Sequence, residues 1–86
     1  MSSNQKSWEN ITRPEYELFV RNLRSKGVTP PYGDSGLLRS SAGLLADLSF
    51  NEKERSLHIR LREVGKGETY ASVLGGFDEQ VKRIDR

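Results

Sequence analysis

Residues 44–61 read LLADLSFNEKERSLHIRL, and apolar residues alternate with mostly polar ones on both sides of a polar centre. The alternating apolar positions are Leu44, Ala46, Leu48, Phe50, Leu57, Ile59 and Leu61. A side-chain period of two is typical of a β-strand that buries one face. Because the polar run 51–56 joins the two halves, the stretch predicts an antiparallel β-hairpin with one buried face.

The register of this hairpin follows from its apolar positions, because a slip of one residue would expose the whole apolar set. We place Phe50 opposite Leu57. The other predicted pairs are, on the buried face, Leu48 with Ile59 and Ala46 with Leu61, and on the outer face, Ser49 with His58, Asp47 with Arg60 and Leu45 with Arg62.

An amphipathic helix is predicted before the hairpin, over residues 13–26. Thr12 and Glu15 have the spacing of a capping box, in which each side chain bonds to the other residue's backbone N–H. Pro14 lies in the first turn, where its missing N–H costs nothing, and Gly27 is a typical C-terminal stop. The apolar stripe at helical spacing consists of Tyr16, Phe19, Val20 and Leu23.

Between this helix and the hairpin, residues 28–36 are almost all turn formers and predict a break in regular structure. Residues 37–39 predict a short edge strand. After Gly65, two structures are possible. An apolar stripe of Val73, Phe77, Val81 and Ile84 predicts a long helix, whereas Gly75 and Gly76 allow a third strand over 68–74 followed by a shorter helix. We favour the long helix because the stripe continues across both glycines.

The predicted fold is therefore a small single α+β domain with the order α-(β)-β-β-α. We expect a twisted antiparallel hairpin or sheet covered on one face by two helices, because an isolated hairpin is marginally stable. The domain is expected to span 11–86, after a flexible N-terminal arm over 1–10. With 86 residues, of which 34% are hydrophobic, the chain has material for one lean core.

Composition excludes several classes of protein. Fourteen Lys and Arg residues against twelve Asp and Glu give a net charge of only +2, and the charges are interleaved along the chain. Dedicated nucleic-acid binders concentrate basic residues on one face. The chain has no cysteine, which excludes disulfides and thiolate metal sites. No apolar run reaches the ~18 residues of a membrane helix, and the polar start predicts a cytoplasmic protein.

No catalytic or cofactor motif is complete. The string Gly-Asp-Ser-Gly at 33–36 predicts a turn, and the glycines around Lys66 lack the spacing of a phosphate-binding loop. His58 is the only histidine, so a zinc or iron site would lack its other usual ligands. We therefore expect no metal, no cofactor and no enzymatic activity.

The outer face of the predicted hairpin is the main candidate binding surface. It carries Leu45, Asp47, Ser49, His58, Arg60 and Arg62, with Arg39 from the preceding segment. The alternative is a merely solvated face, on which Asp47 neutralises Arg60. Trp8 and Tyr32 are further candidates, as aromatic anchors on segments expected to be flexible. Trp8 is also expected to fold back onto the first helix near Leu18.

These features predict a non-enzymatic, cytoplasmic binding or adaptor domain of bacterial or phage type. It would act through a protein partner or as a homo-oligomer, without contact with a membrane. The alternative is a weak nucleic-acid-binding module that uses Arg39, Arg60, Arg62 and His58. A third hypothesis is an enzyme subunit whose site is completed by another chain.

Overall fold

The predicted hairpin lies at the centre of the sheet in the computed structural model, which describes residues 3–84. Strand β4 (Leu45–Asn51) pairs with β5 (Ser56–Glu63), and Phe50 lies opposite Leu57 as predicted. The predicted register is confirmed from there to the pair of Ala46 and Leu61. The predicted pair of Leu45 with Arg62 is wrong, because a β-bulge leaves Arg62 without a partner and places Leu45 opposite Glu63.

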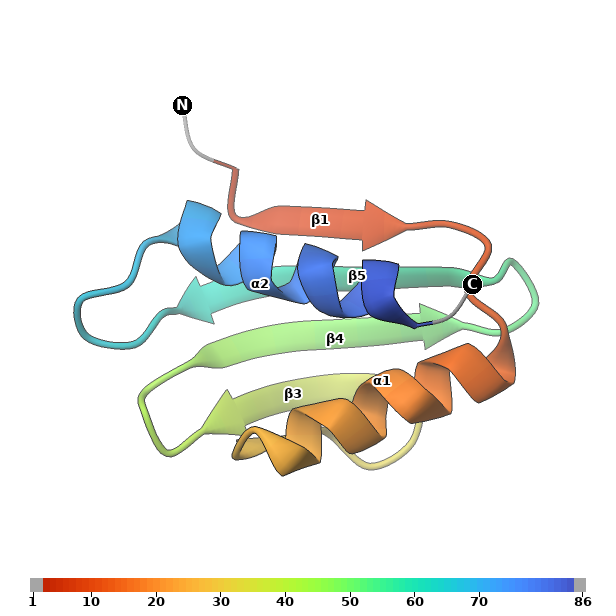
Figure 1. Ribbon diagram of the computed structural model, residues 1–86, viewed down its shortest axis with the longest axis horizontal. Coiled ribbons are helices and arrows are strands. Elements are labelled where there is room, and N and C mark those ends of the chain that lie inside the picture. The colour runs from red at the N-terminus through yellow and green to blue at the C-terminus, as the bar shows by residue number, and fades with distance from the viewer. Residues whose placement is uncertain (1–2, 85–86) are drawn as a thin grey trace.

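Three further strands extend the hairpin to a five-stranded antiparallel sheet in the order β1-β5-β4-β3-β2 (Figure 1). The additional strands are β1 (Gln5–Trp8), β2 (Val28–Thr29) and β3 (Ser35–Ser40). The predicted edge strand over 37–39 is thus longer than expected, and it is not an edge, since β2 pairs with its other side. Strand β2 itself lies in the segment predicted as a break.

The prediction of a flexible arm over 1–10 is wrong for the part that forms β1. Gln5–Trp8 pairs residue by residue with β5, from Gln5 opposite Arg60 to Trp8 opposite Leu57. Asn4 extends the pairing. Its backbone carbonyl accepts the Leu61 N–H at 2.7 Å, and its side-chain Nδ2 donates to the Leu61 carbonyl at 3.1 Å. Backbone bonds need no apolar periodicity, so this strand leaves little trace in the sequence. Residues 1–2 of the predicted arm lie outside the described residues.

Both helices begin at a capping box. Helix α1 (Arg13–Ser25) has Thr12 as its N-cap, and its predicted end at residue 26 is one residue too late. Helix α2 (Tyr70–Arg83) has Thr69 as its N-cap, with Ser72 completing the box. The favoured alternative for the C-terminal segment is therefore confirmed: residues Tyr70–Arg83 are helical, and the two glycines lie inside α2.

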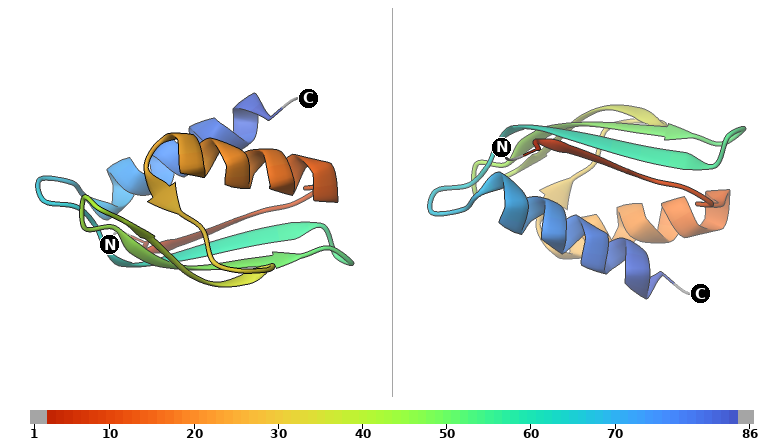
Figure 2. Two further views of the ribbon diagram at one scale, coloured as in Figure 1. Left: turned by 90° about the horizontal axis from the view of Figure 1, so that it is seen from below. Right: turned by 90° about the horizontal axis from the view of Figure 1, so that it is seen from above.

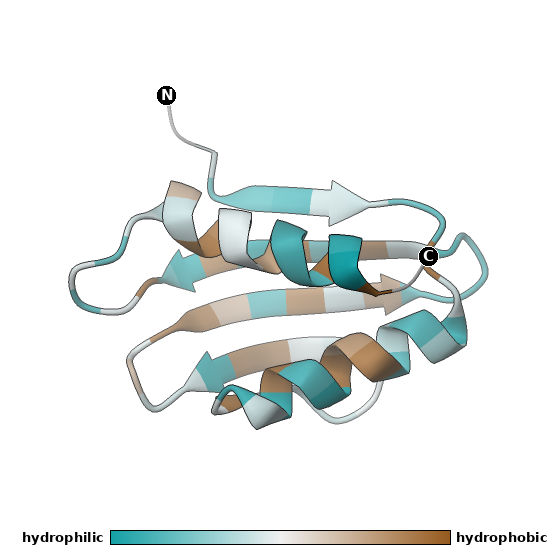
Figure 3. Ribbon diagram, in the orientation of Figure 1, coloured by the Kyte–Doolittle hydropathy of each residue, from teal (hydrophilic) through white to brown (hydrophobic). Residues whose placement is uncertain are grey.

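The two helices cover the same face of the sheet, as predicted, and leave the other face open (Figure 2). The core fills the space between these layers, where both helical stripes meet the inner residues of the strands. Apolar and polar residues alternate along β4 (Figure 3). Its buried apolar side chains face the helices, so the polar side chains between them point to the other side of the sheet. This arrangement defines an outer face, the side of the sheet opposite α1 and α2.

Trp8 joins β1 to α2 rather than to α1. Its side chain is buried, and its indole Nε1 donates a hydrogen bond of 2.9 Å to Oδ1 of Asp78 on α2. Lys6 and Lys82 lie 3.3 and 3.1 Å from the same carboxylate. The expected contact near Leu18 is wrong, because β1 pairs with β5 on the side of the sheet that α2 covers. We call this group of four side chains the Trp8–Asp78 clamp.

Acid should weaken the Trp8–Asp78 clamp. The pKa of Asp78 is lowered to about 2, first by the hydrogen bond from Trp8 and then by Lys82 and Lys6. Unfolded Asp titrates near 3.9, so the carboxylate stabilises the fold above that pH, and this contribution is lost as the pH falls towards about 2. Asp78→Asn keeps an oxygen acceptor but removes the charge. Its melting temperature should lie below that of the wild type at about pH 6, and the gap should shrink in acid. A gap that stays constant down to about pH 2 would contradict this role of the charge.

Candidate binding surface

The outer face brings most of the predicted site residues together. Three cross-strand pairs fix their side chains on the same side of three neighbouring strands. These pairs are Asp47 with Arg60, Ser49 with His58, and Arg39 with Leu45. An open depression lies over this face and is lined by Gln5, Asp47, Ser49, His58, Arg60 and Arg62. Sequence analysis missed Gln5, since the strand that carries it was not predicted.

Asp47 is shared between two arginines at the middle of the outer face. Its Oδ2 accepts a hydrogen bond of 2.9 Å from Nε of Arg62 and one of 3.1 Å from Nη2 of Arg60. These two hydrogen bonds, that of Arg62 first, lower the pKa of Asp47, so the carboxylate stays ionised. Asp47 thus pairs with two guanidinium groups, and Glu63 lies opposite Leu45 on the same face. With Arg39, the face keeps three guanidinium groups against two carboxylates, a surplus of one positive charge. Among residues 3–84, Arg39 makes no ion pair.

Two leucines give the outer face an apolar border. Leu45 and Leu37 are half-buried, and Leu37 lies opposite Asp47 on β3. Arg39 lies opposite Leu45 on this face, and the aliphatic stem of an arginine can add to an apolar contact when a partner covers it. Leu37 is a residue of this surface that sequence reasoning placed in a strand but not at the site.

The bulge in β5 helps to place Arg62. Because Arg62 is the unpaired residue of the bulge, its backbone does not follow the regular alternation of the strand. Its side chain nevertheless reaches Asp47, as the predicted outer position required, although the predicted backbone pair does not form. Arg62 therefore lies on this face, but with a local geometry that differs from the predicted one.

The two aromatic candidates lie elsewhere. Trp8 is buried in the Trp8–Asp78 clamp and faces the helices, so it is not part of an exposed surface. Tyr32 is fully exposed, in the loop between β2 and β3. Neither of them joins the outer-face residues in a single site.

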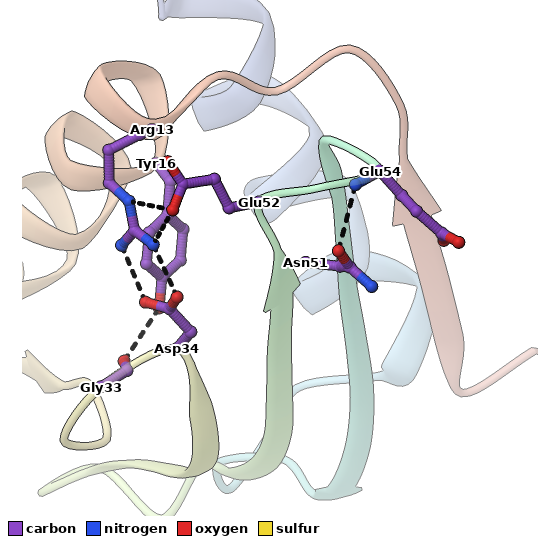
Figure 4. A network of polar contacts seen from close by, with 7 residues as sticks. All are labelled: Arg13, Tyr16, Gly33, Asp34, Asn51, Glu52 and Glu54. Carbon is purple, nitrogen blue, oxygen red and sulfur yellow. Dashed lines mark hydrogen bonds and ion pairs between the residues drawn. The ribbon is translucent and has the colours of Figure 1, made fainter.

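A polar network at one end of the sheet holds the loops in place (Figure 4). Arg13, at the start of α1, donates two hydrogen bonds of 2.8 and 2.7 Å to Asp34 and reaches Glu52 at 2.6 Å. The guanidinium lowers the pKa of Asp34 through these bonds. Beneath it, the rings of Tyr16 and Phe50 stack with centroids 4.2 Å apart. Since its charges are mutually satisfied, the network has a structural role and offers little to a ligand.

A separate cleft lies between α2 and the turn that joins β3 to β4. Its lining includes Ser72, Gln80, Lys26 and Glu68, and the Oε1 atom of Gln80 is buried there without a hydrogen-bond partner among the described residues. Serines line this cleft, but His58 lies on the other side of the sheet, so no histidine base is near them. The cleft holds no constellation typical of nucleophilic catalysis.

No group of three or more His, Cys, Asp or Glu side chains that could hold a metal ion occurs within residues 3–84. In the same part of the chain, neither helix is long and apolar enough to cross a membrane. The outer face thus remains the site with the most convergent candidate residues. No model of a known protein family, no curated protein and no solved structure matches this chain.

Proposed function

We propose that this chain is a non-enzymatic binding domain that docks a protein partner on the outer face of its sheet. The observation that carries the proposal is the combination of position and chemistry. Both helices cover the inner face, and the open outer face gathers Arg39, Arg60 and Arg62 beside half-buried leucines. Arginine is favoured at protein interfaces because its planar guanidinium binds carboxylates in a bidentate way.

The surplus positive charge defines the chemistry of the partner. Arg60 and Arg62 share the single carboxylate of Asp47, so a second carboxylate, supplied by the partner, would complete their pairing. The leucine border and the arginine stems would pack against apolar side chains of the same partner. We therefore expect a partner surface with acidic residues next to apolar ones.

Binding of nucleic acid is the weaker alternative. Three arginines on phosphates would give a log–log salt slope of only about −3, and Asp47 would repel the same backbone. Such binding would nearly vanish at physiological ionic strength. A protein complex that buries leucines and arginine stems should depend much less on salt.

Affinity capture from a lysate of the native host tests the proposal, with the wild-type domain and two double variants as baits. We expect wild type to retain a partner that Arg60→Glu/Arg62→Glu loses, because the variant places acidic groups opposite the partner's carboxylates. Lys53→Glu/Lys66→Glu makes the same change in net charge at two exposed loop positions and should retain the partner. Capture at about 0.15 and 0.5 M salt separates a protein partner from nucleic acid, because Debye screening increases over this range.

Two further measurements decide between the outcomes. Asp47→Lys/Arg60→Glu/Arg62→Glu reverses the charges but keeps the possible ion pairs, so it should fold and still lose the partner. If both outer-face variants fold and keep every captured protein, the outer face is only solvated and the proposal is wrong. If wild type sediments as a dimer and the variants as monomers, the partner is a second copy of this chain.

A further inference from the structure

Of the two large hydrophobic side chains that are exposed within residues 3–84, Leu18 and Tyr32, only Tyr32 is completely exposed to water, with an accessibility of 102%. It lies at the tip of the loop 30–34, between Pro31 and Gly33. Gly33 has a φ of 73°, a left-handed conformation that glycine adopts without strain. An exposed tyrosine at the tip of a turn has the amphipathic ring that is typical of an interface anchor.

The loop that carries Tyr32 is fixed at both ends. Pro30 is buried at its start. At its end, the Asp34 carboxylate binds Arg13 through two hydrogen bonds, and the Asp34 carbonyl accepts the Phe50 N–H at 2.7 Å. Helix α1 and strand β4 thus both hold the C-terminal end of this segment, which the sequence predicts to be flexible. Because the C-terminal end of the loop is already held, binding of a partner to Tyr32 should cost less loop entropy than binding to a free segment would.

A groove runs beside Tyr32, between the loop and α1. Two adjoining depressions, of about 380 and 290 Å³, share Arg24, Pro31 and Gly33 in their lining. Val20 contributes to the first depression and Tyr32 to the second. Both are open and near the lower end of ligand-pocket volumes, so they suit side chains of a peptide segment better than an enclosed small molecule.

The lining of this groove carries one net positive charge, with Arg13, Arg21 and Arg24 against Glu17 and Asp34. Arg21 and Arg24 are both exposed, and within residues 3–84 neither forms an ion pair. Arg13 also lines the groove, but its charge is already balanced by Asp34 and a second carboxylate. Glu17 is the acidic residue of the lining that has no such partner, so two free guanidinium groups outweigh it.

We propose that Tyr32 and the groove beside α1 form a second docking site, for a partner protein segment that carries carboxylates next to an apolar or aromatic side chain. The carboxylates would bind Arg21 and Arg24, and the apolar side chain would pack on Pro31 and Tyr32. A single-stranded nucleic acid could stack a base on Tyr32, but two arginines beside Glu17 would hold few phosphates. This site goes beyond the proposed function, because it lies beside α1 and not on the outer face.

A library of random peptides displayed on phage is the probe for this site, with the wild-type domain as bait. We expect enrichment of peptides with Asp or Glu next to Leu, Phe or Trp. The affinity of a synthetic copy should fall by at least about tenfold in Tyr32→Ala and in Arg21→Glu/Arg24→Glu, as is usual for interface anchors. Tyr32→Phe keeps the ring and should retain most of the affinity.

Two controls separate this site from the outer face and from general charge effects. Arg60→Glu/Arg62→Glu and Lys53→Glu/Lys66→Glu should both bind the selected peptide as the wild type does. The proposal is overturned if no peptide is enriched, or if the enriched peptides lack acidic residues. It is equally overturned if Tyr32→Ala binds them normally, or if a single-stranded oligo(dT) binds the wild type more tightly than they do.

Discussion

Ile59→Ala is expected to destabilise the domain by about 2–5 kcal/mol, the usual cost of truncating a buried Ile to Ala. Ile59 has no exposed surface and lies on β5, between its partners on β4 and β1. The substitution leaves a cavity where strands and helices meet, and small domains have little stability in reserve. For a chain of this size, each kcal/mol lowers the melting temperature by about 4–8 °C.

Thermal or urea unfolding followed by circular dichroism measures this loss. His58→Ala is the matched control, because His58 directly precedes Ile59 on the same strand and is exposed on the outer face. Its effect should stay within about 0.5 kcal/mol. If His58→Ala were the more destabilising of the two, the inner and outer faces of the sheet would be exchanged.

Trp8→Ala is expected to cost about 3–5 kcal/mol, close to the effect of a core substitution, although Trp8 lies on an edge strand. The change removes the ring that packs beneath α2 and the N–H that Asp78 accepts. The Asp78 carboxylate would keep its two lysines but lose its shortest contact. Strand β1 should then separate from β5.

Trp8→Phe divides the effect between packing and hydrogen bonding. It keeps an aromatic ring but no donor, so a loss of about 1–3 kcal/mol is expected for the missing hydrogen bond to a charged acceptor and the smaller ring. Hydrogen exchange should show the amides of β1 that face β5, every second one along the strand, protected in wild type and exchanging rapidly in Trp8→Ala. Rapid exchange of these amides in the wild type itself would restore the flexible arm that the sequence suggested.

The elements with strong periodicity were predictable. The β4–β5 register follows from apolar alternation, since any slip would expose Leu48 and Ile59 together. Helix α1 follows from its capping box and its stripe. Helix α2 was predicted in spite of its two glycines, because its apolar stripe is continuous, and the capping box at Thr69 would have marked its start.

The misplaced elements depend on contacts that local patterns do not record. Strand β1 pairs through its backbone and has a single large apolar residue, Trp8, whose hydrogen-bond partner Asp78 is 70 positions away. The bulge at Arg62 changes the pairing without changing the alternation of residue types. The contact that holds the end of the Tyr32 loop comes from Arg13, on another element, so the turn-forming sequence alone could not indicate it.

The candidate surface was predictable to the extent that it depends on alternation. Arg60 and the residues paired with it lie on the outer face as the pattern required. The sharing of Asp47 between two arginines depends on side-chain conformations and could not be derived from spacing. Trp8 was misplaced for the same reason as its strand.

Because the chain has no cysteine, single-cysteine reporters can test directly whether a partner covers the outer face. Ser49→Cys places a thiol at the centre of that face, and Glu79→Cys places one on the exposed side of α2. Maleimide labelling of each variant is compared with and without the captured partner. We predict that the partner slows labelling at position 49 by at least about tenfold, as expected where an interface excludes water, and leaves position 79 unchanged. Protection at position 79 with unhindered labelling at position 49 would contradict docking on the outer face.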